Sequence, residues 1–195
     1  MFLFSFLVVY FLTTFVLPSW FVWKNTGINP VVLPKDDSVY GFVGGVFKWL
    51  IALVFACIGS KAFAPEKVAH FLPPLGWLDH PFAHTAGWSL LIGSWLLIVA
   101  AQRTMRQSWR IGIDEKEPTE LVQTGLFARS RNPIFLGMVL TMAGLFLVLP
   151  NTVTLLVAVV SWVVISVQIR LEEDFLAKQH GLAYRDYCQK VGRWW

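Results

Sequence analysis

Five long apolar stretches constrain the folding of this 195-residue chain more than any other feature of its sequence. They cover residues 2–22, 40–64, 83–101, 134–149 and 152–169. A helix needs about 20 apolar residues to cross a hydrocarbon core about 30 Å thick, so each stretch meets or approaches the length of a membrane span. The composition, 56% hydrophobic and 14% charged, agrees with this reading. We therefore predict an all-α fold: a polytopic membrane helix bundle with about five transmembrane helices.

The positive charges fall mainly on one side of these predicted spans. The third loop carries Arg103, Arg106, Arg110, Lys116, Arg129 and Arg131, and the tail carries Arg170, Lys178, Arg185, Lys190 and Arg193. The positive-inside rule then places the C-terminus in the cytoplasm and the N-terminus outside. We expect the first stretch to be a retained helix, because no Lys or Arg precedes it and no small-residue cleavage site follows it. Cations that flank apolar spans do not suggest a nucleic-acid-binding groove, so we expect no nucleic acid partner.

Residues 1–195 are expected to form a single domain with two unlike halves. Residues 1–101 supply three transmembrane helices, whereas residues 102–195 contain most of the charge and form the predicted cofactor-binding and catalytic half. The fifth span keeps strong helix formers until Gly181, so it should project beyond the membrane. A short helix over residues 182–189 should follow. The third loop and the tail therefore meet on one membrane face, where we expect the active site.

The third loop ends in a pattern that can bind an anion. Arg129 and Arg131 precede Asn132-Pro133, which has the residue types of a helix N-cap and first helical position. Guanidinium groups beside a helix N-terminus can hold a carboxylate or phosphate. Topological anchoring explains the same two arginines without any ligand.

Other candidate residues also have ordinary explanations. Glu172 and Glu173 lie where the fifth helix leaves the membrane and can bind a ligand, but i,i+4 pairing, as between Arg170 and Asp174, explains charge on this helix equally well. Trp109 is a candidate ligand contact, although most tryptophans near span ends form an aromatic belt. Lys48 is a cation within the second span, which can snorkel or face a polar interior. Histidine spacing gives no convincing metal site, so no metal is expected.

Three motifs in order resemble the isoprenylcysteine carboxyl methyltransferase family. They are residues 120–137 (ELVQTGLFARSRNPIFLG), residues 170–176 (RLEEDFL) and residues 180–187 (HGLAYRDY). The resemblance covers about the C-terminal half and is to a small prokaryotic member. It implies an integral membrane methyltransferase that uses S-adenosylmethionine, releases S-adenosylhomocysteine and accepts a lipophilic or lipidated substrate from the bilayer.

The resemblance also assigns roles to residues of this chain. The implied cofactor-binding residues are Leu121, Val122, Phe127, Asn132, Pro133, Glu172 and Glu173, to which the loop position adds Trp109. Two positions depart from the family pattern, because Asn132 replaces its histidine and Phe135 its tyrosine. We predict Arg129, Arg131, Arg170 and Glu172 as catalytic residues. Arg193 is a further candidate, since an arginine can orient a carboxylate acceptor.

The motifs do not identify the methyl acceptor, so we compare the candidate acceptors by their chemistry. A carboxylate is already ionised at neutral pH and needs no general base, which favours an isoprenylcysteine-like substrate. A phosphatidylethanolamine amine must lose a proton first, and the glutamate pair could take it. An NADPH-dependent sterol-type reductase and a non-enzymatic membrane scaffold are the alternatives from other classes. The sequence does not predict an oligomeric state.

Overall fold

The computed structural model describes residues 1–34, 36–112 and 120–195, so Lys116 lies outside the described residues. Within these ranges all the regular secondary structure is helical, apart from a single parallel bridge between Val31 and Ile111. The helices are α1 (Phe2–Phe11), the π-helical turn η1 (Leu12–Val16), α2 (Leu17–Thr26), α3 (Val39–Phe63), α4 (Pro65–Phe71), α5 (Pro81–Met105), the 3-10 turns η2 (Arg106–Ser108) and η3 (Gly125–Ala128), α6 (Pro133–Val148), α7 (Thr152–His180) and α8 (Leu182–Lys190).

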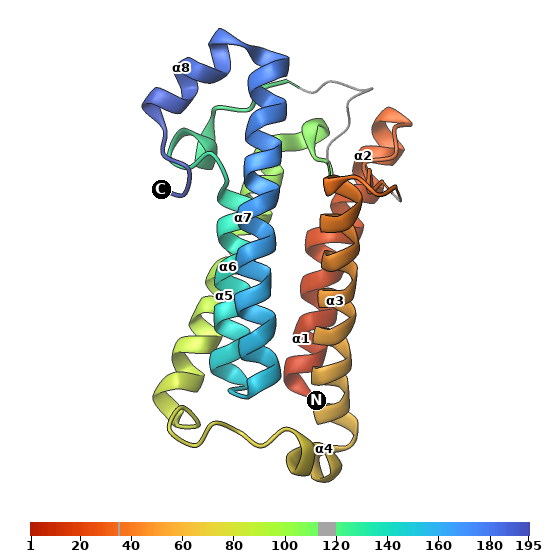
Figure 1. Ribbon diagram of the computed structural model, residues 1–195, viewed down its shortest axis with the longest axis vertical. Helices are drawn as coiled ribbons and strands as arrows, with labels where there is room; N and C mark the ends of the chain where they lie inside the picture. The colour runs from red at the N-terminus through yellow and green to blue at the C-terminus, as the bar shows by residue number, and fades with distance from the viewer. Residues whose placement is uncertain (35, 113–119) are drawn as a thin grey trace.

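The predicted helical membrane bundle is confirmed. Four helices are long and apolar enough to cross a membrane, namely Phe2–Thr26, Val39–Phe63, Pro81–Met105 and Thr152–His180. The predicted fourth span corresponds to α6, which has 16 residues and is therefore about 24 Å long, somewhat short of a full hydrocarbon thickness. The first span combines α1, η1 and α2 into one continuous rod (Figure 1).

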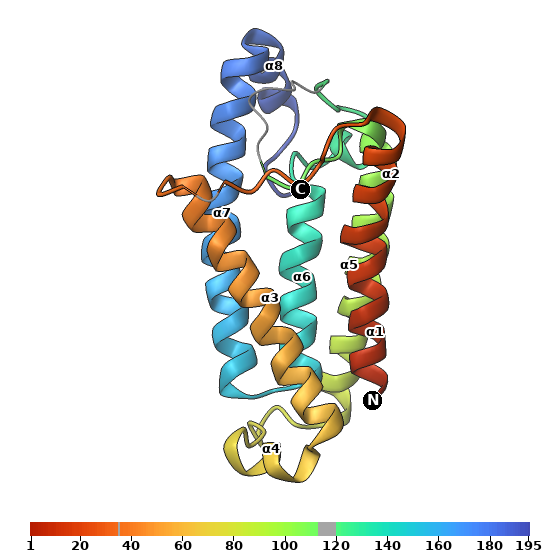
Figure 2. The same ribbon diagram turned by 90° about the vertical axis from the view of Figure 1, so that its right-hand side faces the viewer.

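The long helices run along the longest axis of the molecule with alternating direction (Figure 1). Helix α6 packs between α5 and α7, while α3 contacts both α1 and α7 and crosses the bundle diagonally (Figure 2). We call the end formed by the described residues of the first loop (27–38), the third loop (106–132) and the tail (181–195) the loop end. All the segments predicted to form a site are at this end.

Helices α5 and α6 approach closely because small residues face each other. A Cβ atom on Gly87 would lie 2.8 Å from the carbonyl oxygen of Gly144, which is closer than side chains allow. Further along, the Thr141 hydroxyl is 3.0 Å from the Tyr10 hydroxyl and 2.9 Å from that of Ser94. These buried hydroxyls satisfy one another where no water is available.

Most helix boundaries at the loop end lie where the sequence predicts them. Helix α7 continues past its apolar residues to His180, and α8 begins after Gly181, as predicted. Asn132 and Pro133 take the predicted N-cap and first helical positions of α6, but the Asn132 side chain makes no capping hydrogen bond. The Asn132 amide instead donates to Glu173 on α7 and to the carbonyl oxygen of Arg193.

Candidate functional site

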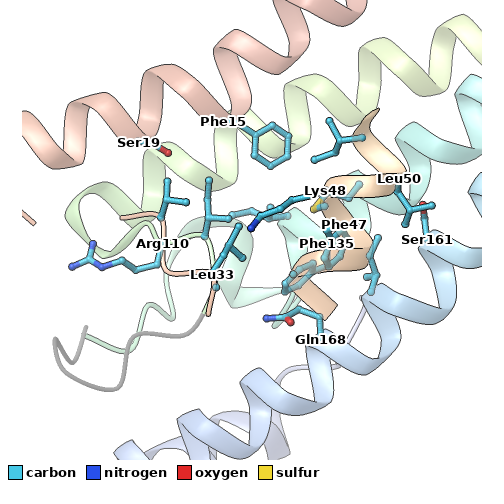
Figure 3. Close-up of a pocket in the computed structure, with 18 of the residues that line it drawn as sticks. Phe15, Ser19, Leu33, Phe47, Lys48, Leu50, Arg110, Phe135, Ser161 and Gln168 are labelled. Atoms are coloured by element: carbon cyan, nitrogen blue, oxygen red, sulfur yellow. The ribbon is translucent and has the colours of Figure 1, made fainter. Parts of the chain in front are cut away.

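A cavity of about 590 Å³ lies inside the bundle near the loop end. Its walls come from α1 to α3, from residues 31–34, and from α6 and α7, and they are mostly apolar and aromatic (Figure 3). The charged side chains among its lining residues are Lys48, Arg110, Arg131 and Glu172. This volume falls within the range of about 300 to 1,000 Å³ that is usual for small-molecule sites. The cavity can therefore hold a lipophilic molecule that carries a polar end.

A smaller cavity of about 90 Å³ adjoins it on the side of the third loop and the tail. Leu121, Val122, Phe175, Tyr184 and Tyr187 line only this smaller cavity. Both cavities are lined by Met105, Arg110, Gly112, Phe127, Arg131 and Glu172. The smaller cavity is below the usual range for a small-molecule site, so a ligand that reaches it would extend past these shared residues from the large cavity.

Glu173 on α7 links the tail to the third loop through ion pairs and hydrogen bonds. The Glu173 carboxylate lies 3.2 Å from Nη2 of Arg131 and 2.6 Å from Nη2 of Arg193, whose Nε donates to both carboxylate oxygens at 3.1 Å. This hydrogen bonding raises the pKa of Arg193 above its ordinary value. The backbone N–H of Arg131 also donates to the carbonyl oxygen of Gly192. Glu173 lines neither cavity, so its contribution is to position Arg131, which lines both.

Glu172, the neighbour of Glu173, has a different environment. It lines both cavities, and among the described residues its carboxylate has no hydrogen-bond or ion-pair partner. A partly buried carboxylate without a partner favours a ligand that brings hydrogen-bond donors or positive charge. The helical charge pairing considered from the sequence is not seen in the described part of α7, where the Arg170 guanidinium donates to the carbonyl oxygen of Ser166 instead.

Helix α8 closes the smaller cavity through buried tyrosines. Tyr184, Tyr187 and Val191 form a small apolar cluster against Leu121. The Tyr187 hydroxyl donates a 2.6 Å hydrogen bond to the carbonyl oxygen of Phe127. Burial raises the pKa of Tyr187 to about 12, so the hydroxyl keeps its proton and the bond at neutral pH. The tail thus fixes both Phe127 and Arg131 in the walls of the site.

The first loop closes the large cavity by pairing with the third loop. The N–H of Val32 donates to the carbonyl oxygen of Ile111, and the N–H of Ile111 donates to that of Pro30, both at 2.8 Å. Gly112 has a φ of +89°, and a Cβ atom there would overlap the carbonyl oxygen of Val32. Only glycine fits this position, since a side chain would combine a strained backbone with a steric clash.

Most of the residues predicted from the sequence lie together. Trp109, Phe127, Arg131, Asn132, Pro133 and Glu172 line the large cavity, and Leu121 and Val122 line the smaller one. Trp109 is only 5% exposed, and its indole Nε1 has no hydrogen-bond partner among the described residues, so it can donate to a bound molecule. Arg129 and Arg170 are exposed and line neither cavity, because each points away from the bundle at its position.

Sequence reasoning missed the contribution of the N-terminal half. Tyr10, Phe11 and Phe15 from the first span, and Phe47 and Lys48 from α3, line the large cavity. These residues lie within apolar spans, where their spacing does not distinguish a cavity wall from a lipid-facing surface. The charge of Lys48 was the one signal that could have indicated the cavity.

Two comparisons relate the chain to known proteins. The sequence model of the family described as phospholipid methyltransferase matches residues 82–183. A protein-S-isoprenylcysteine O-methyltransferase from Saccharomyces cerevisiae is 37% identical over 73 residues, which is 37% of this chain and 30% of the yeast protein. The match thus spans under a third of that relative's length. No solved structure matches the chain significantly.

Proposed function

Because this membrane chain belongs to the phospholipid methyltransferase family, we propose that it transfers a methyl group from S-adenosylmethionine to a lipophilic acceptor. The proposed acceptor group is the carboxylate of an isoprenylcysteine-like molecule, in keeping with the name of the yeast relative. The observation that carries this proposal is that an apolar cavity in the bundle and a smaller cavity under the loop and tail share Phe127, Arg131 and Glu172 as walls.

The residues present suit such a methyl donor. S-adenosylmethionine has hydroxyl and ammonium donors, for which the unpartnered Glu172 carboxylate is a suitable acceptor. Its own carboxylate can accept from the unpartnered Nε1 of Trp109. Leu121 and Val122 would contact it from the smaller cavity. When bound, it supplies a methyl group on a sulfonium and leaves as S-adenosylhomocysteine.

Positioning by this chain accounts for the proposed transfer to a carboxylate. The acceptor is ionised at neutral pH, so no residue has to remove a proton before the carbon–oxygen bond forms and the carbon–sulfur bond breaks. Arg131, held by Glu173, presents its guanidinium to both cavities and can orient the carboxylate at their junction.

A phosphatidylethanolamine-type acceptor is a second candidate, favoured by the description of the matching family and by Glu172. An ammonium must lose a proton before its nitrogen can attack, and the Glu172 carboxylate has no protein partner that would prevent it from accepting that proton. The NADPH-dependent reductase alternative gains no support, because both comparisons name methyltransferases.

Titration of the purified protein with S-adenosylhomocysteine by calorimetry tests the proposal. We expect saturable binding that weakens about tenfold in Glu172→Gln, since one charge-assisted hydrogen bond is lost. Asp174→Asn is the matched control, because Asp174 lies on the same helix, is exposed and lines neither cavity. No binding by the unmodified protein would refute the proposal. Methyl transfer to farnesylcysteine analogues or to phosphatidylethanolamine then distinguishes the two acceptors.

We also propose that the loop end faces the cytoplasm. The third loop and the tail, which carry most of the cations, are both at this end. The positive-inside rule favours the cytoplasmic side for such segments. The proposed partners are therefore a lipophilic acceptor that arrives through the bilayer and a methyl donor from the cytoplasm.

A further inference from the structure

Lys48 is the one cation that the membrane-spanning part of α3 contributes to the large cavity. It lies about 14 Å along α3 from the loop end, at the tenth residue of the helix. Figure 3 shows its side chain extending across the cavity toward the side where Leu33 and Arg110 lie. Lys48 therefore faces an interior cavity, as one of the two readings open from the sequence has it, but the walls of this cavity are mostly apolar and the lysine itself is exposed.

The surroundings of Lys48 do not neutralise its charge. Among the described residues it has no hydrogen-bond or ion-pair partner, and its labelled neighbours in the cavity include Phe15, Phe47 and Phe135. An ammonium group among aromatic side chains within a membrane span is unfavourable unless it finds water or an anion. Such residues in membrane spans usually mark a functional site.

The charges around the cavity favour an anionic ligand. Lys48, Arg110 and Arg131 line it together with a single carboxylate, Glu172. Arg131 is held by Glu173, which leaves Lys48 as a cation for which the described protein supplies no counter-charge. A lipid with an apolar tail and an anionic head would satisfy both the apolar walls and this lysine.

We infer that Lys48 acts together with Arg131 in binding the carboxylate of the lipid acceptor and so helps to select the acid over its methyl ester. This inference rests on the proposed methyl transfer and extends it to a residue outside the family match, which begins at residue 82. Transfer of the methyl group converts the anionic carboxylate into a neutral ester. The attraction of Lys48 for the acceptor is thereby lost, which favours release of the product.

The test compares N-acetylfarnesylcysteine with its methyl ester by calorimetry, using the full chain in nanodiscs of neutral phosphatidylcholine. The unmodified protein should bind the acid about tenfold or more tightly than the ester, and Lys48→Met should reduce this preference to the share that Arg131 contributes. Lys48→Arg should retain the full preference. Lys61→Met is the matched control, because Lys61 lies on the same helix but lines neither cavity.

S-adenosylhomocysteine binding separates failure of this inference from failure of the proposed function. If the unmodified protein binds it and Lys48→Met keeps the full preference for the acid, the role of Lys48 is refuted while the function stands. If nothing binds S-adenosylhomocysteine but the preference still depends on Lys48, the function fails and the anion site stands. Lys48→Gln serves as a second neutral variant if Lys48→Met does not fold.

Phosphatidic acid as a third titrant separates a carboxylate from a phosphate. If Lys48→Met loses affinity for phosphatidic acid but not for the farnesylcysteine acid, the assignment to a carboxylate is overturned. Weakened binding of the farnesylcysteine acid supports it.

Discussion

Replacing Glu173 with Gln removes the charge at the centre of the contacts that hold the tail against the third loop. The substitution keeps the size of the side chain but leaves the guanidinium groups of Arg131 and Arg193 without their counter-ion. Because Arg131 lines both cavities, we expect the change to loosen the tail and to weaken ligand binding together.

The expected loss of free energy depends on how deeply the two ion pairs of Glu173 are buried. The side chains of Arg131 and Glu173 are 13% and 12% exposed, so loss of this ion pair belongs with buried pairs, whose disruption costs about 3–5 kcal/mol. A glutamine oxygen still accepts one hydrogen bond, which reduces the expected loss to about 2 kcal/mol. The Arg193 side chain is 37% exposed and screened by solvent, so its share is about 0.5 kcal/mol. The free energy of an opening that separates both the third loop and the tail from Glu173 should therefore fall by about 2–3 kcal/mol.

Hydrogen exchange measured by mass spectrometry tests this value at the tail. The N–H of Arg131 in the third loop donates to the carbonyl oxygen of Gly192 in the tail, so exchange of this amide reports their separation. A loss of about 2–3 kcal/mol predicts exchange about 30 to 150 times faster in Glu173→Gln. Asp174→Asn, one residue further along α7, should leave this rate unchanged. Equal rates in Glu173→Gln and the unmodified protein would refute the positioning role of Glu173.

Three further predictions concern the rest of the loop end. Tyr187→Phe removes the 2.6 Å hydrogen bond to Phe127 and should lower the free energy of unfolding by about 1 kcal/mol. This change should lower the unfolding temperature by about 2–4 °C, and an unchanged temperature would contradict the contribution of this bond. Gly112→Ala should break the pairing of the first and third loops and lower the affinity for the acceptor, measured by titration. An unchanged affinity would show that the cavity does not need this pairing. On the proposed topology, an impermeant maleimide added to intact cells should label Lys67→Cys but not Lys178→Cys, and the reverse pattern would invert the assigned orientation.

Much of the helical architecture could be predicted from the sequence. Each predicted span overlaps a helix, and the second, residues 40–64, agrees with α3 to within one residue at each end. A helix in a bilayer must satisfy its own backbone hydrogen bonds, so the length of an apolar run directly limits the element that it forms. The extension of α7 to His180 was also predictable, because strong helix formers continue to Gly181.

The candidate site was predicted only in part. The motif residues Phe127, Arg131 and Glu172 lie together as expected, whereas Arg129 and Arg170 face away from both cavities. Neighbouring arginines have the same charge and the same distance from a span, so sequence spacing cannot tell which of them points inward. Asn132 shows the same limit: it is the N-cap of α6 as predicted, but its side chain, instead of capping the helix, donates to Glu173 on α7 and to the carbonyl oxygen of Arg193.

The sequence by itself determined the membrane spans, the clustering of charge and the helices at the chain's end, since all three depend on local composition and periodicity. Only the tertiary structure decided that Glu173 forms an ion pair with Arg131 while Glu172 lines the cavities, although the two residues are adjacent and identical in type. It also decided that Lys48 and Arg131 line the same cavity. Successive residues on a helix point about 100° apart, so what each one contacts depends on where the rest of the bundle packs.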